Sequence, residues 1–415
     1  MNDQLDPGSQ FFFEAFGEVH RRNPLPLYAR MRAESPIIDT GMNMWLVFRH
    51  SECWEVVRAP TASSDERRGT LFRREAETVE RLKLMMDRDP QLVFLDPPDH
   101  TRLRQLVMHG FTPRRVDQLR QRVIALTDSM LDSMAIEAEA NDGVVDIVEG
   151  IAYPLPIAII SELLGVPRED EAQFRAWSAI LARSVDPGML RTDDENTQIE
   201  QANAELSEYF NVLLHTRAED RGDDLLSALL DAREGDDRLT SVELVELAKL
   251  LLIAGHETTV GLIGNGLEAL LDNPDQLAMW RADPSIASKA VDELLRFDSP
   301  VQMVQRITTE PMTLGGHTIP VGDQIICLLA SANHDDAVFD DPDALRLDRP
   351  NANRHVAFGG GIHHCLGATL ARMEAEIVLG RMIERFTVIE QVGESTMRPS
   401  FNLRGRASLR VRIAR

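Results

Sequence analysis

The residue of this sequence with the clearest chemical potential is a cysteine in a glycine-rich segment. Cys365 follows three glycines, an isoleucine and two histidines, and Leu366-Gly367 comes directly after it. Apolar residues at helical spacing then predict a helix from Ala368 to about Phe386. The amide donors and positive dipole end at the start of that helix would favour a thiolate over a thiol. The segment therefore predicts a thiolate suited to bind iron, and the glycines let a flat ligand approach the backbone closely.

The second chemical candidate lies in the middle of a long predicted helix. No proline occurs from Ser241 to Leu271, Thr240 and Glu243 have capping-box spacing, and a D-N-P run follows. The central run A-G-H-E-T-T, residues 254–259, is a poor helix interior because a glycine and two threonines weaken it. Such a centre indicates a functional site, although a kink that serves only packing would give the same pattern. The zinc-protease motif H-E-x-x-H is excluded, since a valine stands where the second histidine is required.

Two other interpretations of Cys365 come from its immediate surroundings. A lone cysteine commonly acts as a small buried hydrophobic residue. A zinc site is the other alternative, because His363 and His364 directly precede the cysteine. Adjacent residues do not easily surround one tetrahedral ion, and the sequence has no C-x-x-C or H-x₃₋₅-H partner. The spacing therefore disfavours zinc.

The composition excludes several classes of protein. The 415 residues include 44 Lys and Arg against 67 Asp and Glu, a net charge of −23 that does not fit a nucleic-acid binder. The three cysteines, Cys53, Cys327 and Cys365, are too scattered for a disulfide framework, which favours a reducing compartment. No uninterrupted apolar run reaches about 18 residues, and the first ten residues lack the basic region of a signal peptide. We expect a cytoplasmic protein without a membrane anchor.

Long helices and small sheets dominate the predicted fold. Amphipathic spacing predicts helices from Asp117 to Met134 and from Gln198 to Arg217. Strand signals are seen in a hairpin from Pro36 to Phe48, a second small sheet from Met312 to Leu329, and a tail strand from Ser408 to Ile413. The charged stretch from Ser63 to Arg88 has no clear assignment. The sequence has no low-complexity linker and no internal repeat, and its elements predict a mainly α protein with small peripheral β-sheets. Its length alone would suggest two or three domains.

The cysteine segment carries a family resemblance. Residues 358–367 read F-G-x-G-x-H-x-C-x-G and continue into L-A-R-M-E, which resembles the haem-ligand loop of the cytochrome P450 family. The resemblance extends from about Pro24 to the C-terminus. It implies a single triangular domain over residues 1–415 that binds haem b through the Cys365 thiolate, an axial ligand that favours dioxygen cleavage. The implied activity is a monooxygenase that inserts one oxygen atom from O2 into a hydrophobic small molecule.

The resemblance also assigns roles to other residues. Thr258 would hydrogen-bond the bound dioxygen, and Glu257 would help to relay the protons that O–O cleavage requires. Glu293, Arg296 and Arg349 would form a structural network behind the haem. Four further side chains would neutralise the haem propionates: His100 and Arg104 in an H-x-x-x-R pair, Arg306, and His363.

Partners and substrate follow from the same resemblance. No further cysteine cluster remains for an iron–sulfur centre, so the electrons are expected from a separate ferredoxin and ferredoxin reductase. The implied pocket walls are mostly aliphatic and predict a hydrophobic or amphipathic substrate. Those walls comprise the loop before His100, the region from Leu181 to Leu190, Leu251 and Ala254, the stretch from Val301 to Val304, and Asn402-Leu403.

Two other functions are compatible with the same fold. One is a peroxygenase driven by H2O2, for which the intact Glu257-Thr258 pair would be atypical. The other is a non-catalytic haem sensor. Turnover with electron-donor proteins would distinguish an enzyme from a sensor.

Overall fold

The computed structural model describes residues 22–77, 91–111, 113–232 and 237–415, with single positions among the first 20 residues and Val79. Most of the unassigned charged stretch beyond Glu77 lies outside the described residues, as does most of the N-terminal start. Two compact units make up the chain. The first holds Met1–His100, Val301–Ala344 and Asn351–Leu366, and the second holds Thr101–Pro300, Leu345–Pro350 and Gly367–Arg415.

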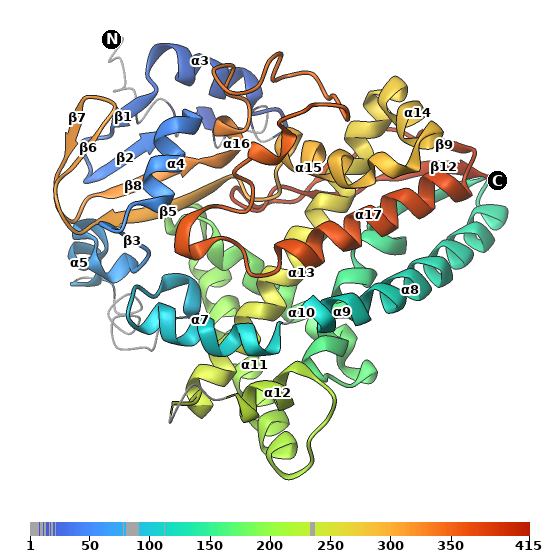
Figure 1. The fold of residues 1–415 in the computed structure, drawn as a ribbon, viewed down its shortest axis with the longest axis horizontal. Coiled ribbons are helices and arrows are strands. Elements are labelled where there is room, and N and C mark those ends of the chain that lie inside the picture. The colour runs from blue at the N-terminus through green and yellow to red at the C-terminus, as the bar shows by residue number, and fades with distance from the viewer. Residues whose placement is uncertain are drawn as a thin grey trace. The chain divides into compact units, whose positions relative to one another are not determined.

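The first unit is built on a five-stranded sheet with the strand order β1-β2-β8-β5-β3 (Figure 1). Its strands are β1 (Ile37–Asp39), β2 (Met44–Val47), β3 (Ala62–Ser63), β5 (Met303–Thr308) and β8 (Gln324–Leu328). The antiparallel pair β1 and β2, with Ile38 opposite Leu46, confirms the predicted hairpin. Strand β8 lies between β2, to which it is parallel, and the antiparallel β5.

The predicted second small sheet is divided between two sheets. Strands β6 (Met312–Leu314) and β7 (His317–Ile319) pair only with each other among the described strands, and positive φ angles of 53° and 85° at Gly315 and Gly316 make their turn. Strand β8 instead joins the larger sheet. Its residues 325–328 are all buried, so both faces of this strand need covering, which a central position provides.

The first unit also contains short helices. They are α3 (Leu25–Glu34), α4 (His50–Arg58), α5 (Thr70–Ala76) and α16 (Leu329–Ala332). Helix α4 buries Cys53, Val56 and Val57 against Val47 and Cys327 of the sheet, within one apolar cluster. Both Cys53 and Cys327 are fully buried there, as expected for cysteines that only pack.

The second unit is mainly helical. Its helices are α8 (Pro113–Ala140), α9 (Pro154–Leu164), α10 (Glu171–Leu181), α11 (Asp193–Glu219), α12 (Leu225–Asp231), α13 (Ser241–Asp272), α14 (Pro274–Ala282), α15 (Ala287–Phe297) and α17 (Ala368–Arg385). The two predicted amphipathic helices lie inside α8 and α11 and are confirmed. Helix α7 (Asp99–Gly110) begins in the first unit and continues into the second.

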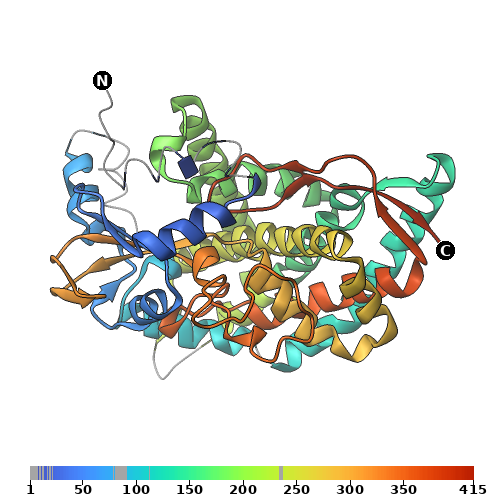
Figure 2. The ribbon, with the colours of Figure 1, turned by 90° about the horizontal axis from the view of Figure 1, so that it is seen from above.

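Helix α13 is the central element of the second unit and packs against α9, α11 and α17 (Figures 1 and 2). Both reciprocal bonds of the capping box between Thr240 and Glu243 are present, and the helix ends at Asp272, directly before Asn273-Pro274, as predicted. By length and apolar composition alone, this helix could cross a membrane. Because 72% of its most apolar window is buried within the protein, we identify it as a core helix.

Two small sheets complete the second unit. Strands β4 (Val144–Asp146), β12 (Arg410–Ala414) and β9 (Val388–Gln391) form an antiparallel sheet, and β10 (Thr396–Met397) pairs with β11 (Arg406–Ser408). The predicted tail strand is thus two strands, β11 and β12, with Leu409 between them. The prediction of a mainly α protein with small β-sheets is confirmed.

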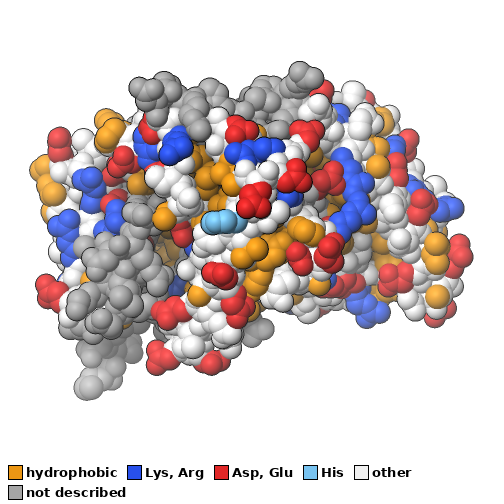
Figure 3. Space-filling model, turned by 90° about the horizontal axis from the view of Figure 1, so that it is seen from below, with side chains coloured by type: hydrophobic (Ala, Val, Ile, Leu, Met, Phe, Trp, Pro, Cys, Tyr) orange, Lys and Arg blue, Asp and Glu red, His pale blue; other side chains and the backbone are white. Residues whose placement is uncertain are grey.

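One face of the surface carries charges of both signs. On the face shown in Figure 3, acidic side chains are scattered among basic and apolar ones. Such mixing of charge is typical of a solvated surface.

Candidate functional site

Cys365 is exposed at the end of a loop in the first unit. The amide of Cys365 donates to the Phe358 carbonyl oxygen at 3.0 Å, which closes the loop, and the turn Gly361–His363 lies between them. Helix α17 begins three residues later, at Ala368, as predicted. The interpretation of Cys365 as a buried packing residue is therefore wrong, because the residue is exposed.

The glycines of this loop let the backbone lie directly on helix α4. A Cβ added to Gly360 would lie 2.9 Å from Val57 Cγ2, and one added to Gly361 would lie 2.6 Å from the Val57 carbonyl oxygen. Gly361 also has a φ of +64°, which side-chain-bearing residues rarely adopt. At Gly359 and Gly367, by contrast, an added Cβ would meet no described atom within 4 Å. The loop is held from the α4 side and left open elsewhere.

Three of the proposed propionate residues lie in the first unit with the cysteine. The imidazoles of His100 and His363 are in contact, with ring centroids 4.2 Å apart, and His100 is buried. Arg306 is buried in β5, and this burial lowers the pKa of its guanidinium, against the weaker opposing effects of Cys327 and Asp96. It donates to the Gln305 carbonyl oxygen at 2.7 Å. A buried cation with so little compensating negative charge fits a ligand carboxylate.

Arg104 belongs to the second unit. It lies on α7 one turn after His100, so the H-x-x-x-R spacing is realised on one helix. Its side chain is half-buried. An exposed thiolate in an open loop, two gathered imidazoles and a buried guanidinium make a donor set that fits a flat metal-bearing ligand with carboxylates, such as haem.

The acid–threonine pair lies at the centre of α13, in the second unit. Most of this helix is buried, yet Ala254 is exposed and Thr258, one turn later on the same face, is partly exposed. The Thr258 hydroxyl donates to the Ala254 carbonyl oxygen at 2.7 Å, and Thr259 donates to Gly255 at 3.0 Å. These are the backbone contacts expected of the threonines, although the helix stays continuous through them. The bonded hydroxyl of Thr258 presents its acceptor lone pairs on the open face.

Glu257 points into a buried cluster of polar side chains. Tyr153 Oη donates to its Oε1 at 3.1 Å, and Arg398 forms an ion pair with its Oε2. His256 Nδ1 lies 3.4 Å from Oε1 and 2.9 Å from Ser178 Oγ. The carboxylate is only 4% exposed, so these partners replace its water. Thr258 and Glu257 are therefore adjacent in sequence but lie in different surroundings.

The charge of Glu257 is fixed by these partners. Burial by itself would raise its pKa, but the His256 hydrogen bond, the Arg398 charge and the Tyr153 hydroxyl lower the pKa to about 2. The pKa of Tyr153 is raised by burial and by the nearby Glu257 carboxylate, so the phenol keeps its proton. As bonded here, Glu257 is a carboxylate that accepts protons poorly at neutral pH.

The sequence analysis did not predict the partners of Glu257. Tyr153, Ser178 and Arg398 come from three distant segments and match no local motif. His256 belongs to the central run of residues 254–259, but no role was predicted for it. The sequence has only three tyrosines, and their rarity draws attention to Tyr153, but it does not say which carboxylate a tyrosine meets.

The predicted structural network is confirmed within the second unit. Arg296 donates through Nε to Glu293 Oε2 at 2.7 Å, and Arg349 Nε lies 3.0 Å from both oxygens of the same carboxylate. The side chains of Glu293 and Arg296 are 0% exposed. A carboxylate buried between two guanidiniums is a structural feature, because neither charge can be removed without leaving the others unpaired.

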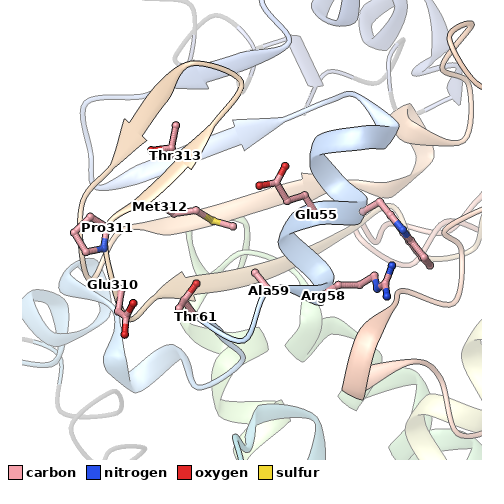
Figure 4. Close-up of a pocket in the computed structure, with 9 residues that line it drawn as sticks. Glu55, Arg58, Ala59, Thr61, Glu310, Pro311, Met312 and Thr313 are labelled. Atoms are coloured by element: carbon pink, nitrogen blue, oxygen red, sulfur yellow. The ribbon is translucent and has the colours of Figure 1, made fainter.

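A hollow of about 550 Å³ lies elsewhere in the first unit (Figure 4). Trp54 and Arg58 of α4 and Met312 of β6 contribute to its walls, and none of the predicted site residues does. We therefore assign it no part in the reaction. Within the described ranges, no group of three or more His, Cys, Asp or Glu side chains is arranged to hold a metal ion. Iron in haem needs only one protein thiolate, since the porphyrin supplies its four nitrogens.

Comparison with known proteins agrees with this geometry. The sequence profile described as "Cytochrome P450" matches residues 67–407. The monooxygenase PikC of Streptomyces venezuelae is 41% identical over 410 residues, 97% of this chain and 94% of that protein. The vitamin D(3) 25-hydroxylase of Pseudonocardia autotrophica is 41% identical over 374 residues, 89% and 88% of the two chains. Ligand-free CYP164A2 of Mycobacterium smegmatis superposes with a TM-score of 0.89 at 37% identity, over 97% and 99%, and the same protein with econazole bound gives 0.88.

Proposed function

This chain is a haem-thiolate monooxygenase of the cytochrome P450 family, and we propose that Cys365 is its haem ligand and a sterol-sized hydrophobic molecule its substrate. The observation that carries the ligand assignment is the exposure of Cys365 in a loop whose glycines lie directly on α4. When bound, haem supplies the activation of dioxygen and the transfer of one oxygen atom to the substrate. The protein supplies orientation, electrostatics and protons.

Four residues hold the haem carboxylates in this proposal. His100, His363 and Arg306 act from the first unit, and Arg104 acts from α7. Support comes from the buried Arg306 guanidinium, whose lowered pKa reflects desolvation that a bound carboxylate would offset. The contact between His100 and His363 supports a shared anionic partner for the two imidazoles.

In this proposal, Thr258 and Glu257 have different parts in proton delivery. Thr258 Oγ1, with its proton committed to Ala254, accepts a hydrogen bond on the open face of α13. Glu257 holds the negative charge that draws protons toward this centre, and Tyr153 and Arg398 keep it oriented. Glu257 must exchange one of these partners, or act through water, to pass a proton to Thr258.

The substrate proposal rests on the apolar character of the predicted pocket walls and on the substrate for which one relative is named. P450 enzymes act on hydrophobic molecules, and one relative is named for its action on vitamin D(3). The exposed Ala254 beside Thr258 gives α13 a small apolar surface at the reactive centre. We therefore propose a rigid apolar molecule of vitamin D(3) size as the substrate class.

Electrons come to P450 enzymes from redox partners, and for this chain we propose a ferredoxin and its reductase. We also propose that the enzyme works in the cytoplasm. Three scattered thiols, two of them buried and unpaired, support a reducing compartment.

The test of ligation is the spectrum of the reduced carbon monoxide complex. We expect the red-shifted Soret band of thiolate ligation in the wild type and its loss in Cys365→Ala. Cys53→Ala and Cys327→Ala are matched controls that should keep the band, because both thiols are buried in the first unit's core. A thiolate spectrum in Cys365→Ala would contradict the assignment.

The test of activity uses vitamin D(3) as the probe. A surrogate ferredoxin, ferredoxin reductase and NADPH should give a product heavier by one oxygen atom. Product formed only with H2O2 would indicate a peroxygenase, and no product with any tested apolar molecule would favour a haem sensor. Econazole, which a solved relative binds, should shift the Soret band through its azole nitrogen if a haem iron is accessible.

A further inference from the structure

One buried hydroxyl group of the first unit has no hydrogen-bond partner among the described residues. Ser64 comes directly after strand β3 and is only 4% exposed, and its Oγ is both buried and unpaired. Buried hydroxyl groups are normally paired, because an unpaired one loses the hydrogen bonds that water would offer. The hydroxyl of Ser64 is therefore suited to a partner that the polypeptide itself does not supply.

The preceding serine shows the ordinary case. Ser63 is buried to a similar degree, but its hydroxyl donates to Asp96 Oδ2 and accepts from the Asp65 amide at 3.0 Å. Continued by one residue, the alternation of side chains along β3 places Ser64 on the face opposite to Ser63. The two adjacent hydroxyl groups therefore have different surroundings, and only that of Ser63 is satisfied by the protein.

Strand pairing brings the unpaired hydroxyl beside Arg306. Strands β3 and β5 are antiparallel, with Ser63 opposite Ile307. One step further along both strands, Ser64 comes opposite Arg306. Residues opposite each other in an antiparallel pair share a face, and their side chains are close enough to act on one ligand group.

This face of the sheet adjoins the cysteine loop through helix α4. Val304, two residues before Arg306 and so on the same face, packs against the apolar cluster that includes Val57 of α4. The loop lies on the same helix, since a Cβ added to Gly360 would be 2.9 Å from Val57 Cγ2. Ser64 and Arg306 therefore face the part of the first unit that holds the proposed haem ligand.

Asp96 connects Ser64 with a second of the proposed propionate residues. Its Oδ1 accepts a hydrogen bond from the Ser64 amide at 3.0 Å, and its carbonyl oxygen accepts one from the His100 amide at 2.9 Å. Its own charge is balanced by Arg68, whose Nε lies 3.2 Å from Oδ2. Asp96 thus fixes the backbone of Ser64 next to the start of the helix that carries His100.

The unpaired hydroxyl accordingly lies among the groups of the first unit that we assign to the haem carboxylates. Arg306 is its neighbour across the strands, His100 is joined to it through Asp96, and the His363 ring contacts that of His100. An ionised carboxylate has about four acceptor sites, so it can accept from a hydroxyl as well as from a guanidinium.

We propose that Ser64 is a further haem-binding residue, whose hydroxyl donates to the haem carboxylate that pairs with Arg306. A hydroxyl adds a hydrogen bond without bringing a second buried positive charge next to the guanidinium. Ser64 holds the cofactor in place and takes no part in oxygen chemistry. This inference rests on the proposed haem-thiolate site, because the haem supplies the carboxylate.

The test measures haem transfer from the ferric holoenzyme to apomyoglobin. In Ser64→Ala we expect transfer to be about tenfold faster or more, since a hydrogen bond to a charged acceptor is lost. The propionate bending band in the resonance Raman spectrum should shift in the same variant. The Soret band of the reduced carbon monoxide complex should stay unchanged, because the cysteine loop is untouched.

The matched control is Ser161→Ala. Ser161 of α9 is 1% exposed, and its Oγ also has no hydrogen-bond partner among the described residues, but it belongs to the second unit. The variant removes the same atom from an equally buried position and leaves a similar void. Neither haem transfer nor the propionate band should change.

Several outcomes would overturn the proposal. Wild-type haem transfer with an unchanged propionate band in Ser64→Ala is one, and it would assign the hydroxyl to a buried water instead. Equal acceleration in Ser161→Ala is another, since a small void would then explain the effect. If Ser64→Ala does not retain haem, Ser64→Cys decides, because a thiol fills nearly the same space but donates weakly, and haem transfer at the wild-type rate would contradict the proposal. A wild-type protein without the thiolate spectrum would instead contradict the proposed haem site.

Discussion

Arg398 forms an ion pair with Glu257 across 141 residues of sequence, and this pair fixes the charge at the centre of α13. Both side chains are largely buried, with exposures of 13% and 4%. The acid beside the reactive threonine is therefore held as a carboxylate by a residue from the C-terminal chain. If Glu257 takes part in proton delivery as proposed, Arg398 is a positioning residue that acts through this carboxylate.

Loss of Arg398 should destabilise the protein. In Arg398→Gln the buried carboxylate loses its cationic partner, and removal of one member of such a pair typically costs about 3–5 kcal/mol. Since the pKa of Glu257 is lowered on folding, its contribution to stability is present above its unfolded pKa of about 4.3 and is lost as the pH falls toward about 2. Urea unfolding should show a constant gap between wild type and variant from pH 6 to 8 and a shrinking gap below about pH 4.5. A gap that widened on acidification would contradict the ion pair.

Replacement of Thr258 should uncouple NADPH consumption from product formation. In Thr258→Ala we expect unchanged haem content and an unchanged carbon monoxide spectrum, but less product and more H2O2 per NADPH, with coupling reduced by about tenfold or more. Thr259→Ala is the matched control, because Thr259 makes the same backbone contact one residue on but is buried. Equal coupling in the two variants would leave Thr258 only a packing role.

Replacement of Arg306 should weaken haem binding. Arg306→Gln removes a buried cation, and loss of one charge-assisted hydrogen bond should accelerate haem transfer to apomyoglobin by about tenfold or more. Arg32→Gln is the control, because Arg32 is also a buried guanidinium of the first unit but donates to Ser331. It should lower stability without affecting haem transfer. The opposite ranking of the two variants would refute the role of Arg306.

Glu374 on α17 should make the free energy of unfolding decrease as the pH rises. It is fully buried, its Oε2 has no hydrogen-bond partner among the described residues, and burial raises its pKa to about 8. A carboxyl with a raised folded pKa contributes stability below its unfolded pKa, about 4.3, and loses it as the pH rises through about 8. Glu374→Gln should therefore become more stable relative to wild type by about 1.4 kcal/mol per pH unit between pH 5 and 8, as measured by urea unfolding. A gap independent of pH would show that Glu374 is ionised in the folded protein.

Local signals allowed much of the fold to be predicted. The capping box at Thr240, the D-N-P end of α13 and the hairpin of β1 and β2 depend on residues only a few positions apart. The placement of β8 could not be predicted in this way, because its parallel pairing with β2 joins residues 280 positions apart. Hydrophobic periodicity identifies a strand but not its neighbour.

The same division holds for the candidate site. The sequence by itself determined which chemical groups are present: a cysteine in the loop that ends at Gly367, an acid–threonine pair in a weakened helix, and cations in the expected order. Tertiary structure decided which of these groups are exposed, paired or buried. Thr258 is partly exposed while Glu257 meets Tyr153 and Arg398. The physical reason is that burial and ion pairing depend on distances in space, and no local pattern encodes which distant donor a carboxylate will meet when the chain folds.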